Sequence, residues 1–137
     1  MKRTAKAHWE GTLKEGKGHL STQSGVLENQ RYSYKTRFEE GEKGTNPEEL
    51  IGAAHAGCFT MSVGAKLTQK GLNPSSLDTE AIVTMQNGEI TGIHLMITGK
   101  VSDISAADFE AITKDAEENC IISKALNVPI TSEAKLV

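Results

Sequence analysis

Uncharged residues fill one long stretch of the chain, where the sixteen positions after Glu49 contain no Asp, Glu, Lys or Arg. Asn46 is a favourable helix N-cap, Pro47 falls at the first helical position, and Glu49 follows Asn46 by three residues, as in a capping box. Gly71 can adopt the left-handed conformation that ends a helix. The pattern predicts a buried helix within Thr45–Gly71, which is too short and too rich in Gly, Ser and Thr to span a bilayer.

The residues before this helix show the features of strands and turns. A turn at Gly16–Gly18 precedes a possible second strand at His19–Thr22. Aromatic and charged residues then alternate over Tyr32–Phe38, and this period of two predicts a further strand with Arg37 on the face opposite the aromatic rings. The charged, glycine-containing segment Glu39–Thr45 is expected to form a loop.

The residues after the helix predict a hairpin, because Asn87-Gly88 is a strong two-residue turn signal between Asp78–Met85 and Gly92–Val101. Gly99 is a possible break in the second of these strands. Three further elements complete the chain: a helix beginning at Ser105, a helical turn at Ile121–Asn127 and a strand at Pro129–Leu136. The order of strands, helix, hairpin, helix and strand predicts a single α+β domain over residues 1–137.

The composition narrows the class of protein. The 15 basic and 18 acidic residues give a net charge of −3, which argues against a nucleic-acid-binding surface. Basic residues near the N-terminus are not followed by an apolar run, so no signal peptide is predicted and we expect a cytoplasmic protein. In that compartment, cysteines are more often redox-active or catalytic than joined in stable disulfides.

The chain has two cysteines, Cys58 and Cys120, and their separation of 62 positions excludes CxxC redox and zinc motifs. One interpretation is that both are buried and act as small hydrophobic residues. The other is that both are reactive. Cys120 precedes a helical turn whose N–H groups can stabilise a thiolate, whereas Cys58 lies mid-helix and needs a cation, for which Arg37 is the candidate.

Glu48 precedes Cys58 by ten residues, a rise of about 15 Å along a straight helix. It cannot serve the Cys58 of its own chain unless the helix breaks. It can serve the Cys58 of a second chain, act through Arg37 on a folded-back loop, or simply favour the helix dipole.

His55 lies three residues before Cys58 on the predicted helix, which suggests either a metal site or a Cys–His nucleophile pair. The chain has no further Cys or His at ligand spacing, which disfavours a metal. A Cys–His enzyme of the acyl-transfer type remains an alternative.

The sequence resembles the OsmC/Ohr family of osmotically inducible and organic-hydroperoxide-resistance proteins, and is most similar to its OsmC branch. The matching blocks are HWEG at 8–11, GKG at 16–18, STQSGVL at 21–27, TRFEEGEKGTNPEELIGAAHAGCF at 36–59 and CIISKAL at 120–126. The resemblance implies an OsmC-like fold, with antiparallel sheets wrapped around two central helices. It also implies an intertwined homodimer with its active sites at the subunit interface.

The resemblance further implies a thiol-dependent peroxidase of organic hydroperoxides that needs no metal, flavin or haem. The family's peroxidatic and resolving cysteines fall on Cys58 and Cys120, its arginine on Arg37 and its glutamate on Glu48. The expected reductant is an external dithiol, either lipoyl-type or thioredoxin-like. Ile121 departs from the family pattern, which usually has Pro after the second cysteine and so presets the start of the next helix.

An apolar setting for Cys58 would favour organic hydroperoxides over hydrogen peroxide, because an alkyl tail gains free energy on burial. Five residues are candidates for this apolar wall: Phe38, Leu50, Ile51, Phe59 and Met61. The competing hypothesis is a non-enzymatic dimeric stress protein whose two cysteines are buried and inert.

Overall fold

A computed structural model describes all 137 residues and confirms the α+β class. The chain divides into two compact units, Met1–Leu50 and Ile51–Val137, each described by itself below. The helix α2 (Pro47–Gln69) begins in the first unit and continues without interruption into the second.

The first unit contains an antiparallel three-stranded sheet in the order β1-β2-β3. Its strands are β1 (Ala5–Glu10), β2 (Lys17–Thr22) and β3 (Gln30–Tyr32). Gly18 of β2 pairs with Trp9 on one side and Tyr32 on the other, and the two rings have centroids 5.5 Å apart. A Cβ atom on Gly18 would lie 2.5 Å from the Tyr32 ring and 2.6 Å from Trp9, so only glycine fits between them.

The prediction of a strand through Phe38 is wrong, because residues 34–38 form the short helix α1 (Tyr34–Phe38). Ser33 caps this helix: its hydroxyl accepts the Thr36 N–H at 3.2 Å, and its own N–H donates to Thr36 Oγ1 at 2.8 Å. This capping box determines the local conformation in spite of the alternating pattern. Arg37 is therefore not opposite the aromatic residues, and its guanidinium carbon lies 5.3 Å from the centre of the Phe38 ring.

The predicted ends of α2 are confirmed. Asn46 Oδ1 accepts the Glu49 N–H at 2.8 Å, which satisfies one of the free donors at the helix N-terminus. At the other end, the Leu72 N–H donates to the Leu67 carbonyl at 3.0 Å, and Gly71 has a φ of 77°. This is the arrangement in which a left-handed glycine ends a helix.

The second unit contains a sheet in the order β4-β5-β6. Its elements are β4 (Ser76–Gln86), β5 (Glu89–Lys100), α3 (Ala106–Asn119), α4 (Ile121–Ala125) and β6 (Ile130–Leu136). The predicted hairpin joins β4 and β5, with positive φ at Asn87 and Gly88. The expectation of purely antiparallel sheets is not met, because β6 runs parallel to β5. Parallel strands need a crossover connection, which α3 and α4 provide.

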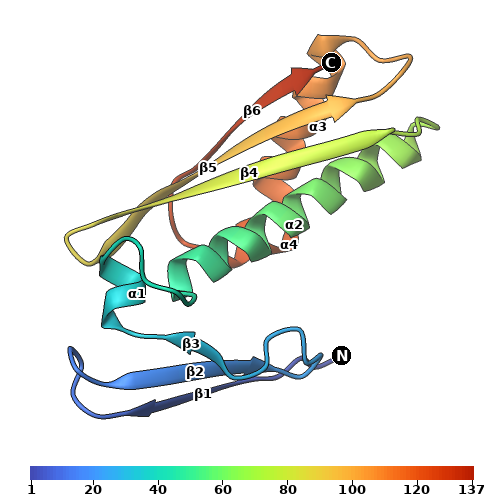
Figure 1. Cartoon of the computed structure of the whole chain (residues 1–137). Helices are drawn as coiled ribbons and strands as arrows, with labels where there is room; N and C mark the ends of the chain where they lie inside the picture. Colours follow the sequence, from blue (N-terminus) through green and yellow to red (C-terminus); the bar gives the residue numbers. More distant parts are fainter. The chain divides into compact units, whose positions relative to one another are not determined.

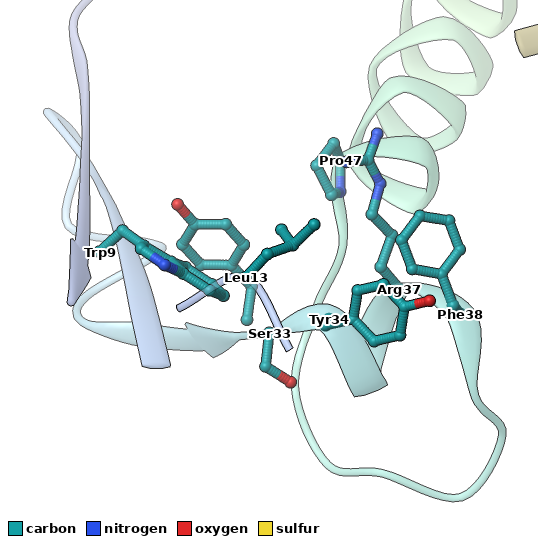
Figure 2. Close-up of a pocket in the computed structure, with 8 residues that line it drawn as sticks. Trp9, Leu13, Ser33, Tyr34, Arg37, Phe38 and Pro47 are labelled. Atoms are coloured by element: carbon teal, nitrogen blue, oxygen red, sulfur yellow. The ribbon is translucent and has the colours of Figure 1, made fainter. Parts of the chain in front are cut away.

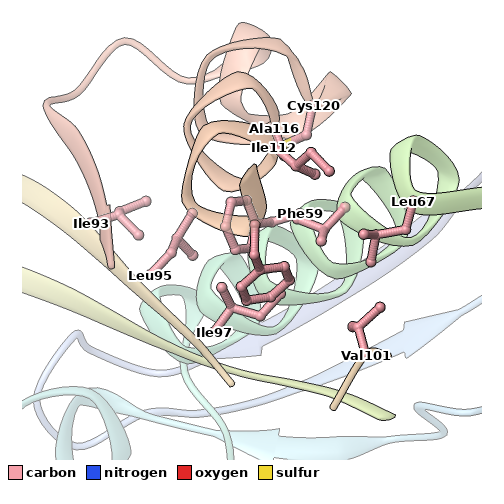
Figure 3. Packing of buried hydrophobic residues seen from close by; sticks show 11 residues of the cluster. Phe59, Leu67, Ile93, Leu95, Ile97, Val101, Ile112, Ala116 and Cys120 are labelled. Carbon is pink, nitrogen blue, oxygen red and sulfur yellow. The ribbon is translucent and has the colours of Figure 1, made fainter. Parts of the chain in front are cut away.

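The core lies between one face of this sheet and the helices α2 and α3, which cover the same side of it (Figures 1 and 3). Alternate residues of β5 point into the core, and each helix contributes residues spaced three or four apart. The main members are Phe59, Val63, Leu67, Ile93, Leu95, Ile97, Phe109, Ile112 and Ala116.

Gly99 does not break β5. A Cβ atom there would lie 2.5 Å from the Phe109 ring, so this glycine leaves room for the ring.

The expectation that α2 is buried holds for one face only. Its opposite face is exposed within this chain and carries small and apolar residues, with Met61 77% exposed. A Cβ atom on Gly57, which lies on this face, would meet no other atom within 4 Å. None of the helices is long and apolar enough to cross a membrane.

Candidate functional site

Arg37 and Glu48 form an ion pair in the first unit. Arg37 donates to Glu48 Oε1 from Nε at 2.9 Å and from Nη2 at 2.6 Å. The Glu48 side chain is 13% exposed, and its second oxygen, Oε2, is buried without a hydrogen-bond partner. The carboxylate therefore orients the guanidinium through one oxygen and keeps the other available as an acceptor.

Local hydrogen bonds bring Arg37 to Glu48. The Asn46 side chain donates to the Thr36 carbonyl at 3.2 Å, which ties α1 to the start of α2. The intervening loop folds back, since the Thr45 N–H donates to the Arg31 carbonyl at 2.8 Å. The contact of Glu48 with Arg37 through a folded-back loop, one of the predicted alternatives, is therefore present. Glu48 also lies in the first turn of α2, where the helix dipole favours a carboxylate.

Arg37 lines a cavity of about 270 Å³ within the first unit (Figure 2). Its walls are mostly aromatic and aliphatic, and Arg37 is the only charged residue among them. The lining residues are Trp9, Leu13, Tyr32, Ser33, Tyr34, Arg37, Phe38 and Pro47. The cavity therefore combines one cation with an apolar surface, and the predicted wall residue Phe38 is part of it.

Cys58 and Cys120 line one cleft of about 580 Å³ in the second unit. Both are free thiols: Cys58 is half-buried, and Cys120 is 2% exposed. The cleft is mostly apolar and lies between α2 and the junction of α3 with α4. Of the predicted wall residues, Met61 lines this cleft, whereas Phe59 is fully buried in the core.

Cys120 is the N-cap of α4. The Ser123 N–H donates to Cys120 Sγ at 3.3 Å, as expected for a sulfur placed before a helical turn, and Ser123 Oγ lies 3.0 Å from the same sulfur. The helix begins at Ile121, so proline is not required for this start. The Ile121 side chain is 77% exposed.

His55 contacts Ser123 rather than Cys58. Its Nε2 lies 2.7 Å from Ser123 Oγ, its side chain is fully buried, and no hydrogen bond joins it to Cys58. Ser123 was not predicted from the sequence, because a capping box has Glu or Gln three residues after a Ser or Thr N-cap and the segment Cys120–Ser123 does not match that pattern. No group of three His, Cys, Asp or Glu side chains is arranged to hold a metal ion.

The four predicted site residues thus form two pairs, each within one unit. Arg37 and Glu48 are in direct contact in the first unit, and Cys58 and Cys120 share a cleft in the second. The helix α2 is unbroken between Glu48 and Cys58, so the helix break considered for Glu48 does not occur.

Comparison with known proteins shows the family and the fold. The sequence pattern of the family described as "OsmC-like protein" matches residues 40–135, more than half of the chain. The chain belongs to the OsmC-like family. This membership was expected from the matching sequence blocks between residues 8 and 126, and it is confirmed.

Several relatives of this OsmC-like chain have informative names. It is 48% identical over 134 residues to "Peroxiredoxin OsmC" of Escherichia coli (strain K12), covering 95% of this chain and 93% of that protein. It is 28% identical to "Organic hydroperoxide resistance protein OhrB" of Bacillus subtilis (strain 168), covering 86% and 89% of the two chains. An OsmC-like protein from Mycoplasma pneumoniae has the same fold, with a TM-score of 0.76, 14% identity and coverage of 100% and 98%.

The buried His55 of this OsmC-like chain predicts a pH dependence of stability. Burial lowers the pKa of His55 below its ordinary value of 6.5, because the low-dielectric interior disfavours the imidazolium. Below pH 6.5 the unfolded chain binds a proton at His55 that the folded chain does not, until the pH reaches the lower folded pKa. The contribution of the neutral His55 side chain to the free energy of unfolding is therefore fully present above pH 6.5, and it is lost as the pH falls below that value.

The measurement is the free energy of urea unfolding from pH 7.5 to pH 5 for the wild type and His55→Gln. The glutamine retains a polar group but does not titrate. We expect the wild type to lose more stability than the variant on acidification. Equal losses would contradict a lowered pKa for His55.

Proposed function

We propose that this protein is a cysteine-based peroxidase that reduces organic hydroperoxides, and hydrogen peroxide more weakly. The observation that carries the proposal is the presence of two free thiols, Cys58 and Cys120, in one apolar cleft. The names of its relatives, a peroxiredoxin and an organic hydroperoxide resistance protein, support the same chemistry. Two cysteines in one site can be oxidised to a disulfide and reduced again without any metal, flavin or haem.

In the proposed reaction, the Cys58 thiolate attacks the terminal oxygen of the hydroperoxide. The O–O bond breaks, the alcohol leaves with a proton, and Cys58 becomes a sulfenic acid. The Cys120 thiol then attacks the Cys58 sulfur, a disulfide forms and water leaves. An external dithiol, lipoyl-type or thioredoxin-like, exchanges with this disulfide and restores both thiols.

Arg37 is the proposed cation for the Cys58 thiolate. Its guanidinium remains charged at any physiological pH, and Glu48 holds it through two N–H contacts to a single oxygen. This leaves other N–H donors of Arg37 free to face a thiolate or a peroxide oxygen.

A preference for organic hydroperoxides follows from the apolar lining of both cavities. An alkyl tail gains about 25 cal/mol for each Å² of apolar surface that it buries, a contribution that hydrogen peroxide lacks. The aromatic cavity around Arg37 and the cleft around Cys58 each offer such surface.

We also propose that the protein is a homodimer in which the exposed face of α2 is covered by a second chain. This face lacks charge and contains Ala53, Ala54, Gly57, Met61 and Ala65. Small residues allow the close approach of another backbone, and an uncharged exposed face of this kind is typical of a protein–protein contact. Light scattering that gives the mass of one chain would contradict the dimer.

The experiment that tests the proposed function is intact-mass analysis of the reduced protein before and after one equivalent of cumene hydroperoxide. We expect a product lighter by two hydrogens per chain, with no free thiol left to alkylate. This result requires that Cys58 and Cys120 have joined.

An unchanged mass with two alkylatable thiols would overturn the proposal and favour the inert stress protein. The Cys–His acyl-transfer alternative predicts the same indifference to peroxide together with thioester hydrolysis. His55 is hydrogen-bonded to Ser123 and not to Cys58, so the structure does not support this alternative.

A further inference from the structure

A continuous chain of hydrogen-bonding contacts runs from a thiol to an imidazole inside the second unit. Cys120 Sγ lies 3.0 Å from Ser123 Oγ, and Ser123 Oγ lies 2.7 Å from His55 Nε2. Cys120 is 2% exposed, Ser123 7% and His55 0%, so all three groups are shielded from bulk water. The contacts join α2 to α4 across 68 positions of the sequence.

We infer that Ser123 and His55 form a proton relay that activates Cys120 for disulfide formation. The inference rests on the proposed peroxidase function. Ser123 contacts the reacting sulfur directly, and His55 acts through it as a positioning residue and proton acceptor.

The relay moves one proton in two short steps. Before reaction, the Cys120 S–H donates to Ser123 Oγ and the Ser123 O–H donates to His55 Nε2. As the Cys120 sulfur attacks the Cys58 sulfenic acid, its proton passes to Ser123 while the Ser123 proton passes to His55. The S–O bond of Cys58 breaks, and the departing hydroxide takes a proton from solvent in the cleft and leaves as water. The imidazolium then returns its proton to solvent by way of Ser123, which is 7% exposed. The products are a disulfide, water and a neutral imidazole.

Burial gives such a relay a purpose. The thiolate is the nucleophile in disulfide formation, and a thiol that is only 2% exposed has little contact with water that could take its proton. The Ser123 N–H, at 3.3 Å from the Cys120 sulfur, supplies a further hydrogen bond that stabilises the thiolate once it forms.

The state of His55 suits the role of acceptor. Burial lowers its pKa, so the imidazole is neutral at neutral pH and Nε2 can receive a proton. Its Nδ1 is buried and has no hydrogen-bond partner in the chain, so no carboxylate holds the ring in a charged form.

The first test is rapid mixing of reduced protein with cumene hydroperoxide, following sulfenic acid and then disulfide formation. We expect Ser123→Ala to lower the ratio of the disulfide rate constant to the sulfenic acid rate constant by about 10²-fold. Ser123→Thr keeps the hydroxyl and is expected to restore most of the ratio. Thr113→Val is the matched control, since Thr113 is a fully buried hydroxyl without a hydrogen-bond partner.

The second test needs no peroxide and therefore separates the relay from the proposed function. In a Cys58→Ser background, the absorbance at 240 nm reports the pH at which half of Cys120 is thiolate. We expect Ser123→Ala to move this midpoint upward by about one pH unit, because it removes a hydrogen bond to the anion. His55→Gln is expected to shift it in the same direction.

The two tests have distinct negative outcomes. Absence of a sulfenic acid phase in the wild type would overturn the peroxidase function. The 240 nm titration needs no peroxide, so it would still test whether Ser123 and His55 influence the ionisation of Cys120. An unchanged midpoint in both Ser123→Ala and His55→Gln would overturn the relay. An equal loss of the rate ratio in Thr113→Val would also overturn it, since the effect would then come from packing.

Discussion

Replacement of Cys58 by serine is expected to abolish peroxide turnover, lowering kcat/KM by on the order of 10³-fold or more. A serine hydroxyl is not ionised at neutral pH and cannot form a sulfenic acid, so the first step of the proposed reaction disappears. The measurement is the consumption of cumene hydroperoxide with a dithiol reductant such as dihydrolipoamide. Residual turnover within tenfold of the wild type would rule out Cys58 as the peroxidatic residue.

The matched variant is Cys120→Ser, which keeps the first step and removes the second. Its Cys58 is expected to undergo one oxidation and then to accumulate as sulfinic or sulfonic acid under excess peroxide. Mass analysis distinguishes these products from the disulfide of the wild type. Full multiple turnover without Cys120 would contradict its resolving role.

Replacement of Phe109 by alanine is expected to destabilise the fold by about 3–5 kcal/mol. The ring is 1% exposed and packs over Gly99, where even an added Cβ atom would lie 2.5 Å away. Its loss leaves a cavity between α3 and β5 that the surrounding side chains cannot fill. The free energy of urea unfolding of the reduced protein, measured at one protein concentration, tests this result.

Phe38→Ala is the matched control, because it makes the same chemical change at a ring that is 48% exposed. The expected loss there is below about 1 kcal/mol. Equal losses at Phe109 and Phe38 would show that the core is not organised around Phe109 as the structure indicates.

Several elements could be predicted from the sequence because their ends are marked by local signals. Asn46 and Gly71 mark the ends of α2 because an N-cap side chain and a left-handed glycine satisfy backbone groups in their immediate vicinity. Asn87-Gly88 marks the hairpin for the same kind of reason, since both residues take positive φ in the turn. Each signal acts over a few residues and does not depend on the rest of the fold.

The segment from Tyr34 to Phe38 shows how one local signal can override another. Its alternating pattern predicts a strand, but the reciprocal hydrogen bonds between Ser33 and Thr36 start a helix instead. The aromatic rings of Tyr34 and Phe38 then lie one turn apart, with centroids separated by 4.8 Å. A period of two over so few residues is weaker than a satisfied capping box.

The sequence by itself determined the α+β class, the caps of α2, the β4–β5 hairpin and, through its resemblance, the OsmC-like family. Only the tertiary structure decided that β6 runs parallel to β5 and that His55 contacts Ser123. The physical reason is the separation along the sequence of the residues that make each contact. Caps and turns are closed by neighbouring residues, whereas contacts across 68 positions form only when helices and strands bury their apolar faces in one core.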